Sequence, residues 1–291
     1  MSQFNSRQNA KDFTWLCVLY VMFYFAQYPI MTFLAVYLRS LNFSNVQVGI
    51  LTSVGPVMTI FAQNFWGTVA DRAKTKNLVL IVVILGTGAA SLLLHVHSIH
   101  KYFFVMILIL AALYFFFLSI QSLSETITLE VASRERMNYG VIRGLGSAGF
   151  ALTGLLFSLF PGLTVEQMFI IFSIASFAVL LPALFLPKTR GHQSEGGGKK
   201  MNISALFKYR DLMLVIIFVF LVYVCMNFAI TFYPVYFTDD LGLPKALFSR
   251  YMAIGVFIQA IMMFFAPKLF RHINLYQLFL IGGALTSIRL F

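Results

Sequence analysis

The sequence has 291 residues, of which 60% are hydrophobic and 11% are charged. A soluble domain is about half apolar and about a quarter charged, so this composition excludes an ordinary soluble protein. The net charge of +11 is compatible with a nucleic-acid partner, but its distribution along the chain has a different explanation.

Apolar residues are concentrated in nine blocks of about 20 residues, each able to cross a bilayer as a helix. The blocks cover residues 13–38, 46–69, 77–95, 102–129, 139–160, 166–187, 211–238, 246–267 and 274–291. The first block is too long for a signal peptide and lacks a small-residue cleavage site. The sequence therefore predicts an all-α, polytopic membrane protein in a lipid bilayer, with about nine transmembrane helices.

Basic residues are distributed unevenly among the segments between the blocks. With a cytoplasmic N-terminus, fifteen Lys and Arg residues fall on the cytoplasmic side. Four fall on the outer side, namely Arg39, Lys101, Lys245 and Arg250. Such a bias predicts a multi-pass protein of the cell membrane with its N-terminus in the cytoplasm, and no nucleic-acid partner is needed to explain the charge.

A glycine-rich polar linker, residues 188–210, separates six blocks (1–187) from three (211–291). FLAVYLRSLNFSNVQVG (33–49) resembles FYPVYFTDDLGLPKALFS (232–249) at an offset of about 200 residues. Two parallel six-helix repeats joined by a long cytoplasmic loop are a transporter architecture. On this hypothesis the second repeat is incomplete and needs about 100 residues more. The alternative is that two helix–loop–helix units rich in Phe and Leu are alike by composition.

The loop between the second and third blocks reads GTVADRAKTKN, residues 67–77. It resembles the G-x-x-x-D-R-x-G-R-[KR] signature of the major facilitator superfamily at Gly67, Asp71 and Arg72, and departs from it at Lys74 and Thr75. Gly67 would let two helices approach closely. Asp71 could cap a helix or pair with cations across a cytoplasmic interface. These three residues are gate candidates, and the alternative is a charged cytoplasmic turn.

Two charged residues lie inside the fourth and fifth blocks. Glu125 precedes Arg134 by nine residues, and Arg143 follows it by nine. Equal distances from the centre of a tight hairpin predict similar depths in the membrane, where an acid and a base can neutralise each other. The alternative is that Arg143 extends to the cytoplasmic headgroups.

The sequence around this arginine, YGVIRGLGSAGFAL, resembles the Y-G-x-x-R-x-x-G-S-x-G-F segment of the proton symporters for oligosaccharides, nucleosides and phenylpropionate. This branch of the superfamily includes lactose permease, where the matching glutamate and arginine bind sugar hydroxyls. The resemblance therefore implies a major-facilitator-like helical bundle in which Glu125 and Arg143 bind the substrate. Gly140 and Gly144 form a G-x-x-x-G pair that allows close helix contact.

Two further segments resemble the same branch. GGALTSIRLF (282–291) resembles a helix whose arginine takes part in proton coupling, which implies that role for Arg289 together with Glu125. An interfacial arginine is the alternative. IGVFIQAIMMFFAP (254–267) resembles the eighth helix, but Val256 stands where lactose permease has a sugar-binding glutamate. Galactosides are therefore not the expected substrates.

Other polar residues of the apolar blocks are weaker candidates for substrate binding: Tyr24, Gln27, Asn227 and Gln259. Tyr20, Tyr24 and Tyr28 recur every four residues, a stripe that packing more commonly explains. His95, His97 and His100 match no usual zinc spacing, so no metal site is expected. No cofactor other than a coupling proton is expected.

Without a phosphate-binding loop or a catalytic triad, an enzyme is not expected either. The sequence predicts a secondary transporter that carries a small polar organic molecule, such as a sugar, nucleoside or aromatic acid, by proton symport. Two alternatives stay open. One is a drug-type proton antiporter, which would have a more apolar cavity. The other is a truncated, transport-inactive chain.

Overall fold

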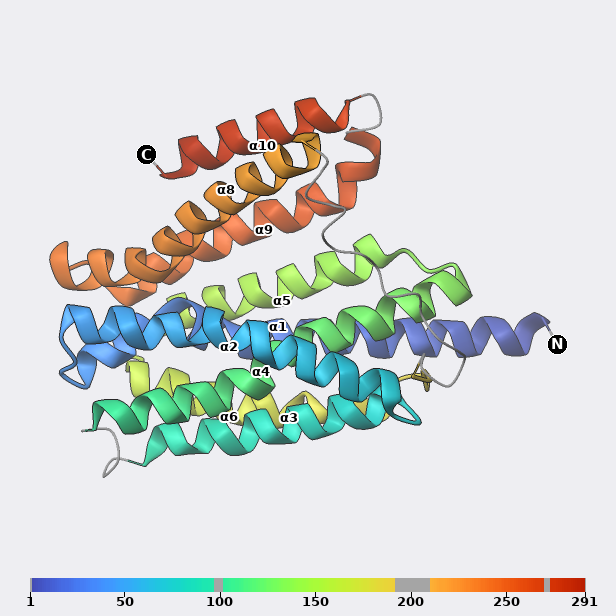
Figure 1. Ribbon diagram of the computed structural model, residues 1–291, viewed down its shortest axis with the longest axis horizontal. Coiled ribbons are helices and arrows are strands. Elements are labelled where there is room, and N and C mark those ends of the chain that lie inside the picture. Colours follow the sequence, from blue (N-terminus) through green and yellow to red (C-terminus); the bar gives the residue numbers. More distant parts are fainter. Residues whose placement is uncertain (1, 97–101, 192–209, 270–272, 291) are drawn as a thin grey trace.

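The computed structural model describes residues 2–96, 102–191, 210–269 and 273–290, and these residues form helices and connecting loops without strands (Figure 1). The first part of the chain contains α1 (Ser2–Ser40), α2 (Asn45–Arg72), α3 (Lys76–Leu92), α4 (Phe103–Glu135), α5 (Tyr139–Leu159) and α6 (Val165–Ala178). A 3-10 turn, η1 (Leu93–His95), extends α3, and a short helix, α7 (Leu180–Leu184), follows α6. The second part contains α8 (Arg210–Val235), a π-helical turn η4 (Tyr236–Asp240), α9 (Lys245–Leu269) and α10 (Leu275–Leu290).

The predicted all-α, polytopic architecture is confirmed. In the described ranges, eight helical segments are long and apolar enough to cross a membrane. The ninth apolar block forms α10, which has 16 residues. Residues 192–209 of the predicted linker lie outside the described part of the chain.

Helix α1 occupies the centre of the first six helices. It packs against α5 and α6, while α4 packs against α2 and α3. The second part joins through two pairs of helices, α5 with α9 and α1 with α8. A cavity between the two parts must therefore be bounded by α1 or α5 on one side and by α8 or α9 on the other.

The two parts of the chain meet most closely at one end of the bundle. We call it the Arg39 end, because α1 finishes there, and we call the opposite end, where α2 finishes, the Asp71 end. The rings of Phe33 in α1 and Phe248 in α9 lie 6.0 Å apart in an edge-to-face arrangement. Figure 1 shows α8 and α9 approaching α1 at the Arg39 end and diverging from the first six helices toward the Asp71 end.

Glycines of α5 allow its close packing against α1 at Gly146 and Gly149. A Cβ at Gly149 would lie 2.5 Å from the backbone oxygen of Val21, and one at Gly146 would lie 2.8 Å from the ring of Tyr24. A Cβ at Gly140 would meet only the cap residue Asn138 of its own helix. Among the described residues, Gly140 thus makes no close contact with another helix, whereas Gly144 is buried in α5.

We expect Gly149→Ala to destabilise the protein by about 1–3 kcal/mol, because the new methyl group would overlap the Val21 carbonyl and force α1 and α5 apart. Gly49→Ala is the matched control, since a Cβ there would meet no heavy atom within 4 Å. It should be neutral or stabilise α2 by about 0.5–1 kcal/mol. Thermal unfolding in detergent measures both, and equal melting temperatures for the two variants would contradict the assignment.

Candidate functional site

The hairpin between α4 and α5 positions the two buried charges. Helix α4 ends at Glu135 because Arg136 adopts a left-handed φ of 54°. Helix α5 begins after Asn138, whose side-chain oxygen accepts a hydrogen bond from the Gly140 amide at 3.0 Å. The hairpin is asymmetric, so the expected equal spacing of the two residues from its centre is wrong: Glu125 lies 10 residues from the end of α4 (135 − 125), whereas Arg143 lies 4 residues into α5 (143 − 139).

The predicted contact between these charges is nevertheless present. Arg143 Nε lies 4.0 Å from Glu125 Oε1, with 22% and 34% of the two side chains exposed. The long arginine side chain compensates for the difference in depth along the hairpin. Arg143 therefore lies beside a carboxylate inside the bundle, which opposes the alternative in which it extends to the headgroups.

Three further groups hold this pair in place. The Gln121 amide donates a hydrogen bond to Glu125 Oε1 at 3.2 Å, one helical turn before the carboxylate. Arg143 donates to Ser147 Oγ at 3.5 Å. Its guanidinium carbon also lies 4.5 Å from the centroid of the Tyr24 ring, a cation–π geometry. The predicted candidate Tyr24 is thus a neighbour of the pair, and its role in binding stays a prediction.

A cavity of about 400 Å³ lies between the two parts of the chain, bounded by α1, α2, α4 and α8. This volume suits a small-molecule ligand. Both Gln27 and Asn227, predicted from the sequence, line it. It also exposes polar side chains that the sequence analysis did not select: Thr32, Thr52, Thr59, Tyr114, Gln121, Tyr223 and Thr231.

Gln121 connects the cavity to the charged pair, because it lines the cavity and donates to Glu125. It also borders a small recess together with Tyr24 and Ser124. The hydroxyl groups of Tyr24 and Ser124 are buried without a hydrogen-bond partner in the described part of the chain. A buried hydroxyl without a partner is unfavourable by about 1–3 kcal/mol.

Two sequence candidates are not part of this arrangement. Gln259 is exposed on α9 and does not line the cavity, whereas the adjacent Ala260 is buried. The role expected for Gln259 in substrate binding therefore stays a prediction. Arg289 belongs to α10, and its side chain lies outside the described part.

The gate candidates occupy the Asp71 end. A Cβ at Gly67 would meet no heavy atom within 4 Å among the described residues, so the expected close helix approach is not present there. The face of α2 that contacts α4 is instead marked by Trp66, whose indole nitrogen donates to the Phe115 carbonyl at 3.0 Å. Asp71 is half-buried and Arg72 is exposed.

The loop after Asp71 is attached to two other segments. Lys76 Nζ lies 2.8 Å from Glu130 Oε2 of α4, with only 1% of the lysine side chain exposed. The Asn77 side chain accepts from the Thr189 amide at 2.9 Å and donates to the Pro187 carbonyl at 3.1 Å. The loop is therefore held against α4 and the chain that follows α7. Lys76 is a buried structural charge and not simply one of the cytoplasmic basic residues.

These features define a helical membrane protein with a cavity between two groups of helices, lined by both polar and apolar side chains. The model of the MFS_1-like family matches residues 13–291, so the chain belongs to this family of the major facilitator superfamily. It is 27% identical over 269 residues to the uncharacterized transporter YwbF of Bacillus subtilis (strain 168), covering 89% of this chain and 64% of that protein.

Two other comparisons agree with the family. The chain is 26% identical over 208 residues to a maltose permease of Geobacillus stearothermophilus, covering 71% of this chain and 52% of the permease. The crystal structure of the nucleoside transporter NupG has the same fold, with a TM-score of 0.70 and 18% identity, over 89% of this chain and 67% of NupG. The chain thus spans 64% and 52% of the lengths of the two curated relatives.

A double-mutant cycle tests the charged pair. Because both side chains are partly exposed, we expect a favourable Glu125–Arg143 coupling energy of about 1 kcal/mol from Glu125→Gln, Arg143→Gln and the double variant. The matched control cycle uses Glu125 and Arg134, which lie about 14 Å apart along α4 and should couple by less than about 0.3 kcal/mol. Thermal unfolding in detergent provides the free energies. A coupling as small as that of the control would contradict the interaction.

Proposed function

We propose that this protein carries a small polar organic solute, such as a sugar, nucleoside or aromatic acid, across the cell membrane by proton symport. The observation that carries the proposal is the cavity of about 400 Å³ between the two groups of helices, with amide and hydroxyl side chains on its walls. Gln121 links this cavity to the pair formed by Glu125 and Arg143. The maltose permease relative supports a sugar as the substrate.

The side chains around the cavity suit a solute with several hydroxyl groups. Gln27 and Asn227 approach from α1 and α8, so one solute can contact both parts of the chain at once. Arg143 has a planar group that can serve a carboxylate and a solute hydroxyl together. The Glu125–Arg143 pair disfavours the drug-type antiporter, for which no such pair is expected.

The arrangement of the helices suits one state of an alternating-access cycle. Contacts at the Arg39 end, such as Phe33 with Phe248, hold the two parts together, and the helices diverge toward the Asp71 end. With the N-terminus in the cytoplasm, as the positive-inside bias favours, this is a state closed toward the outside. Rocking of one part against the other would then expose the cavity to the opposite side.

Proton coupling requires a group that exchanges a proton as the protein changes state. Glu125 suits this role because it contacts Arg143 and Gln121 beside the cavity. Protonation of Glu125 would remove the charge that neutralises Arg143 and free the guanidinium for the solute. We assign Arg289 to the same coupling mechanism on the resemblance of its segment.

Transport assays with the full chain in liposomes test this function. We expect counterflow of a labelled sugar, nucleoside or phenylpropionate, and uptake driven by an imposed proton gradient. Glu125→Gln should abolish the gradient-driven uptake and retain part of the counterflow, because exchange needs no net proton movement. Transport of hydrophobic cations in exchange for protons would support the antiporter instead. Absence of transport for every solute would exclude the proposal for this chain.

The Asp71 loop provides a separate prediction. Asp71→Asn should slow transport several-fold and leave solute affinity nearly unchanged, because Asp71 lies at the end of α2 and does not line the cavity. Lys74→Gln, in the same loop and exposed, is the control and should have little effect on either quantity. Solute-binding calorimetry and initial uptake rates separate the two effects. A large loss of affinity in Asp71→Asn would contradict a role restricted to the change of state.

A further inference from the structure

We propose that Arg39 and Asp239 form a gate that controls access to the cavity from the Arg39 end. The inference rests on the proposed transport function. It gives a role to one residue from each part of the chain, and neither residue is a candidate from the sequence. Arg39 is the penultimate residue of α1, and Asp239 belongs to the π-helical turn η4 after α8.

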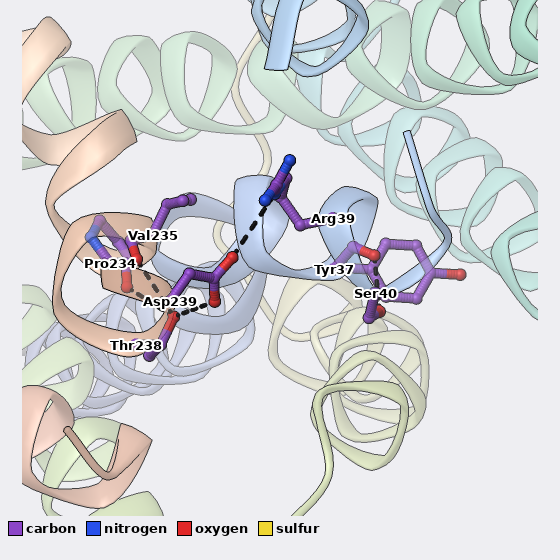
Figure 2. A network of polar contacts seen from close by, with 7 residues as sticks. All are labelled: Tyr37, Arg39, Ser40, Pro234, Val235, Thr238 and Asp239. Atoms are coloured by element: carbon purple, nitrogen blue, oxygen red, sulfur yellow. Dashed lines mark hydrogen bonds and ion pairs between the residues drawn. The ribbon is translucent and has the colours of Figure 1, made fainter. Parts of the chain in front are cut away.

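The two side chains face each other across the boundary between the parts (Figure 2). Arg39 Nε lies 3.5 Å from Asp239 Oδ2, with 36% and 34% of the two side chains exposed. The hydroxyl group of Thr238 lies 2.9 Å from the other carboxylate oxygen and 2.9 Å from the Pro234 carbonyl, and these two acceptors share its one proton. The carboxylate is thus oriented from its own part of the chain while it contacts the arginine of the other.

The pair lies on the route between the cavity and the Arg39 end. The cavity-lining residues of α1 extend to Ala35, one turn before Arg39, and those of α8 extend to Thr231, about two turns before Asp239. A second recess of about 310 Å³ lies at this level, and both members of the pair line it together with Asn45 and Asp240. Separation of Arg39 from Asp239 would therefore open the boundary at that recess.

The local backbone differs between the two equivalent helix ends. In the repeated segments, Val36-Tyr37 corresponds to Val235-Tyr236. The Leu41 amide bonds to the carbonyl four residues back, at Tyr37, whereas the Leu241 amide bonds five residues back, at Tyr236. The wider π turn rotates the side chains that follow Tyr236 relative to a continuing α-helix, and such turns are frequent at functional sites.

The weakness of the pair suits a gate. A partly exposed ion pair at 3.5 Å changes an equilibrium by a factor of about two to five. It can bias the protein toward the closed arrangement and still break in every transport cycle. A contact that exists in only one of two states changes the free-energy difference between them by the free energy of that contact.

Site-directed labelling tests the gate without reference to the solute. Ile230→Cys places a thiol in the cavity wall, in a chain whose native cysteines are replaced by Cys17→Ser and Cys225→Ser. An impermeant maleimide is applied to intact cells and to inverted vesicles. These two preparations expose opposite faces of the protein, so the reagent has access to the Arg39 end in one of them. We expect Asp239→Asn and Arg39→Gln each to raise the labelling rate from that side about two- to fivefold.

Asp240→Asn is the matched control, because Asp240 lines the same recess and no ion pair of the described residues includes it. It removes the same charge and should leave the labelling rate unchanged. The exchange variant Arg39→Asp/Asp239→Arg should return the rate toward that of the parent chain. Equal rates for Asp239→Asn and Asp240→Asn, or no recovery on exchange, would overturn the gate.

The labelling result and the transport result are separable. A higher labelling rate in Asp239→Asn with no transported solute would retain the gate as a conformational contact and reject the proposed transport function. Transport with identical labelling of all variants would retain the function and reject the gate. If Asp239→Asn folds poorly, Arg39→Gln tests the same contact from the other side.

Discussion

A charged side chain inside a bilayer is stable only where other protein groups provide the polar contacts that water would otherwise provide. Arg143 meets this requirement with a carboxylate, a hydroxyl group and an aromatic face, contributed by three different helices. The almost completely buried Lys76 has the Glu130 carboxylate as its ion-pair partner, at 2.8 Å. Both arrangements require that α4 be held against its neighbours, since it supplies Glu125 and Glu130. The packing of α4 and the neutralisation of these charges therefore depend on each other.

The same requirement explains why polar groups gather in one place. Gln121 lies one helical turn from Glu125, so its amide can satisfy the carboxylate and still border the cavity. Gln27 and Asn227 extend this polar surface onto α1 and α8. Elsewhere the spans are largely apolar, and many of their large side chains are exposed, as lipid-facing surfaces require. Under the proposed function, a solute with hydroxyl groups would find hydrogen-bond partners at the boundary between the two parts.

The sequence predicts the helices and the main charged contact because both depend on local patterns. Length and composition determine the spans, and the presence of one acid and one base near a hairpin predicts their contact. The equal spacing from the hairpin centre is not found, because where α4 ends depends on the left-handed conformation of Arg136, which the pattern does not reveal. The spacing of Gln121 and Glu125 is a signal that could have been used, since residues four apart on a helix are neighbours.

Other features depend on contacts between distant segments. Lys76 and Glu130 are 54 positions apart, and their pairing follows from how α3 packs against α4. The sequence motif at Gly140 and Gly144 permits a close helix contact but does not determine which turn of α5 another helix crosses. The crossing lies at Gly146 and Gly149, where α1 leaves no space for a side chain. Gly67 shows the reverse case, a glycine in the family signature beside open space.

Of the four ion pairs between described residues, three join different elements, and their exposure differs in a way that suits the proposed movement. Lys76–Glu130 is the shortest and has the most deeply buried cation, and it lies within the first six helices, which would move as a unit. Glu125–Arg143 is longer and partly exposed beside the cavity, where the proposed function requires that a solute or a proton can disturb it. Arg39–Asp239 joins the two parts themselves and has the most exposed side chains of the three. Because solvent weakens an ion pair and burial makes it costly to break, this order keeps each part rigid and leaves the boundary between them free to open.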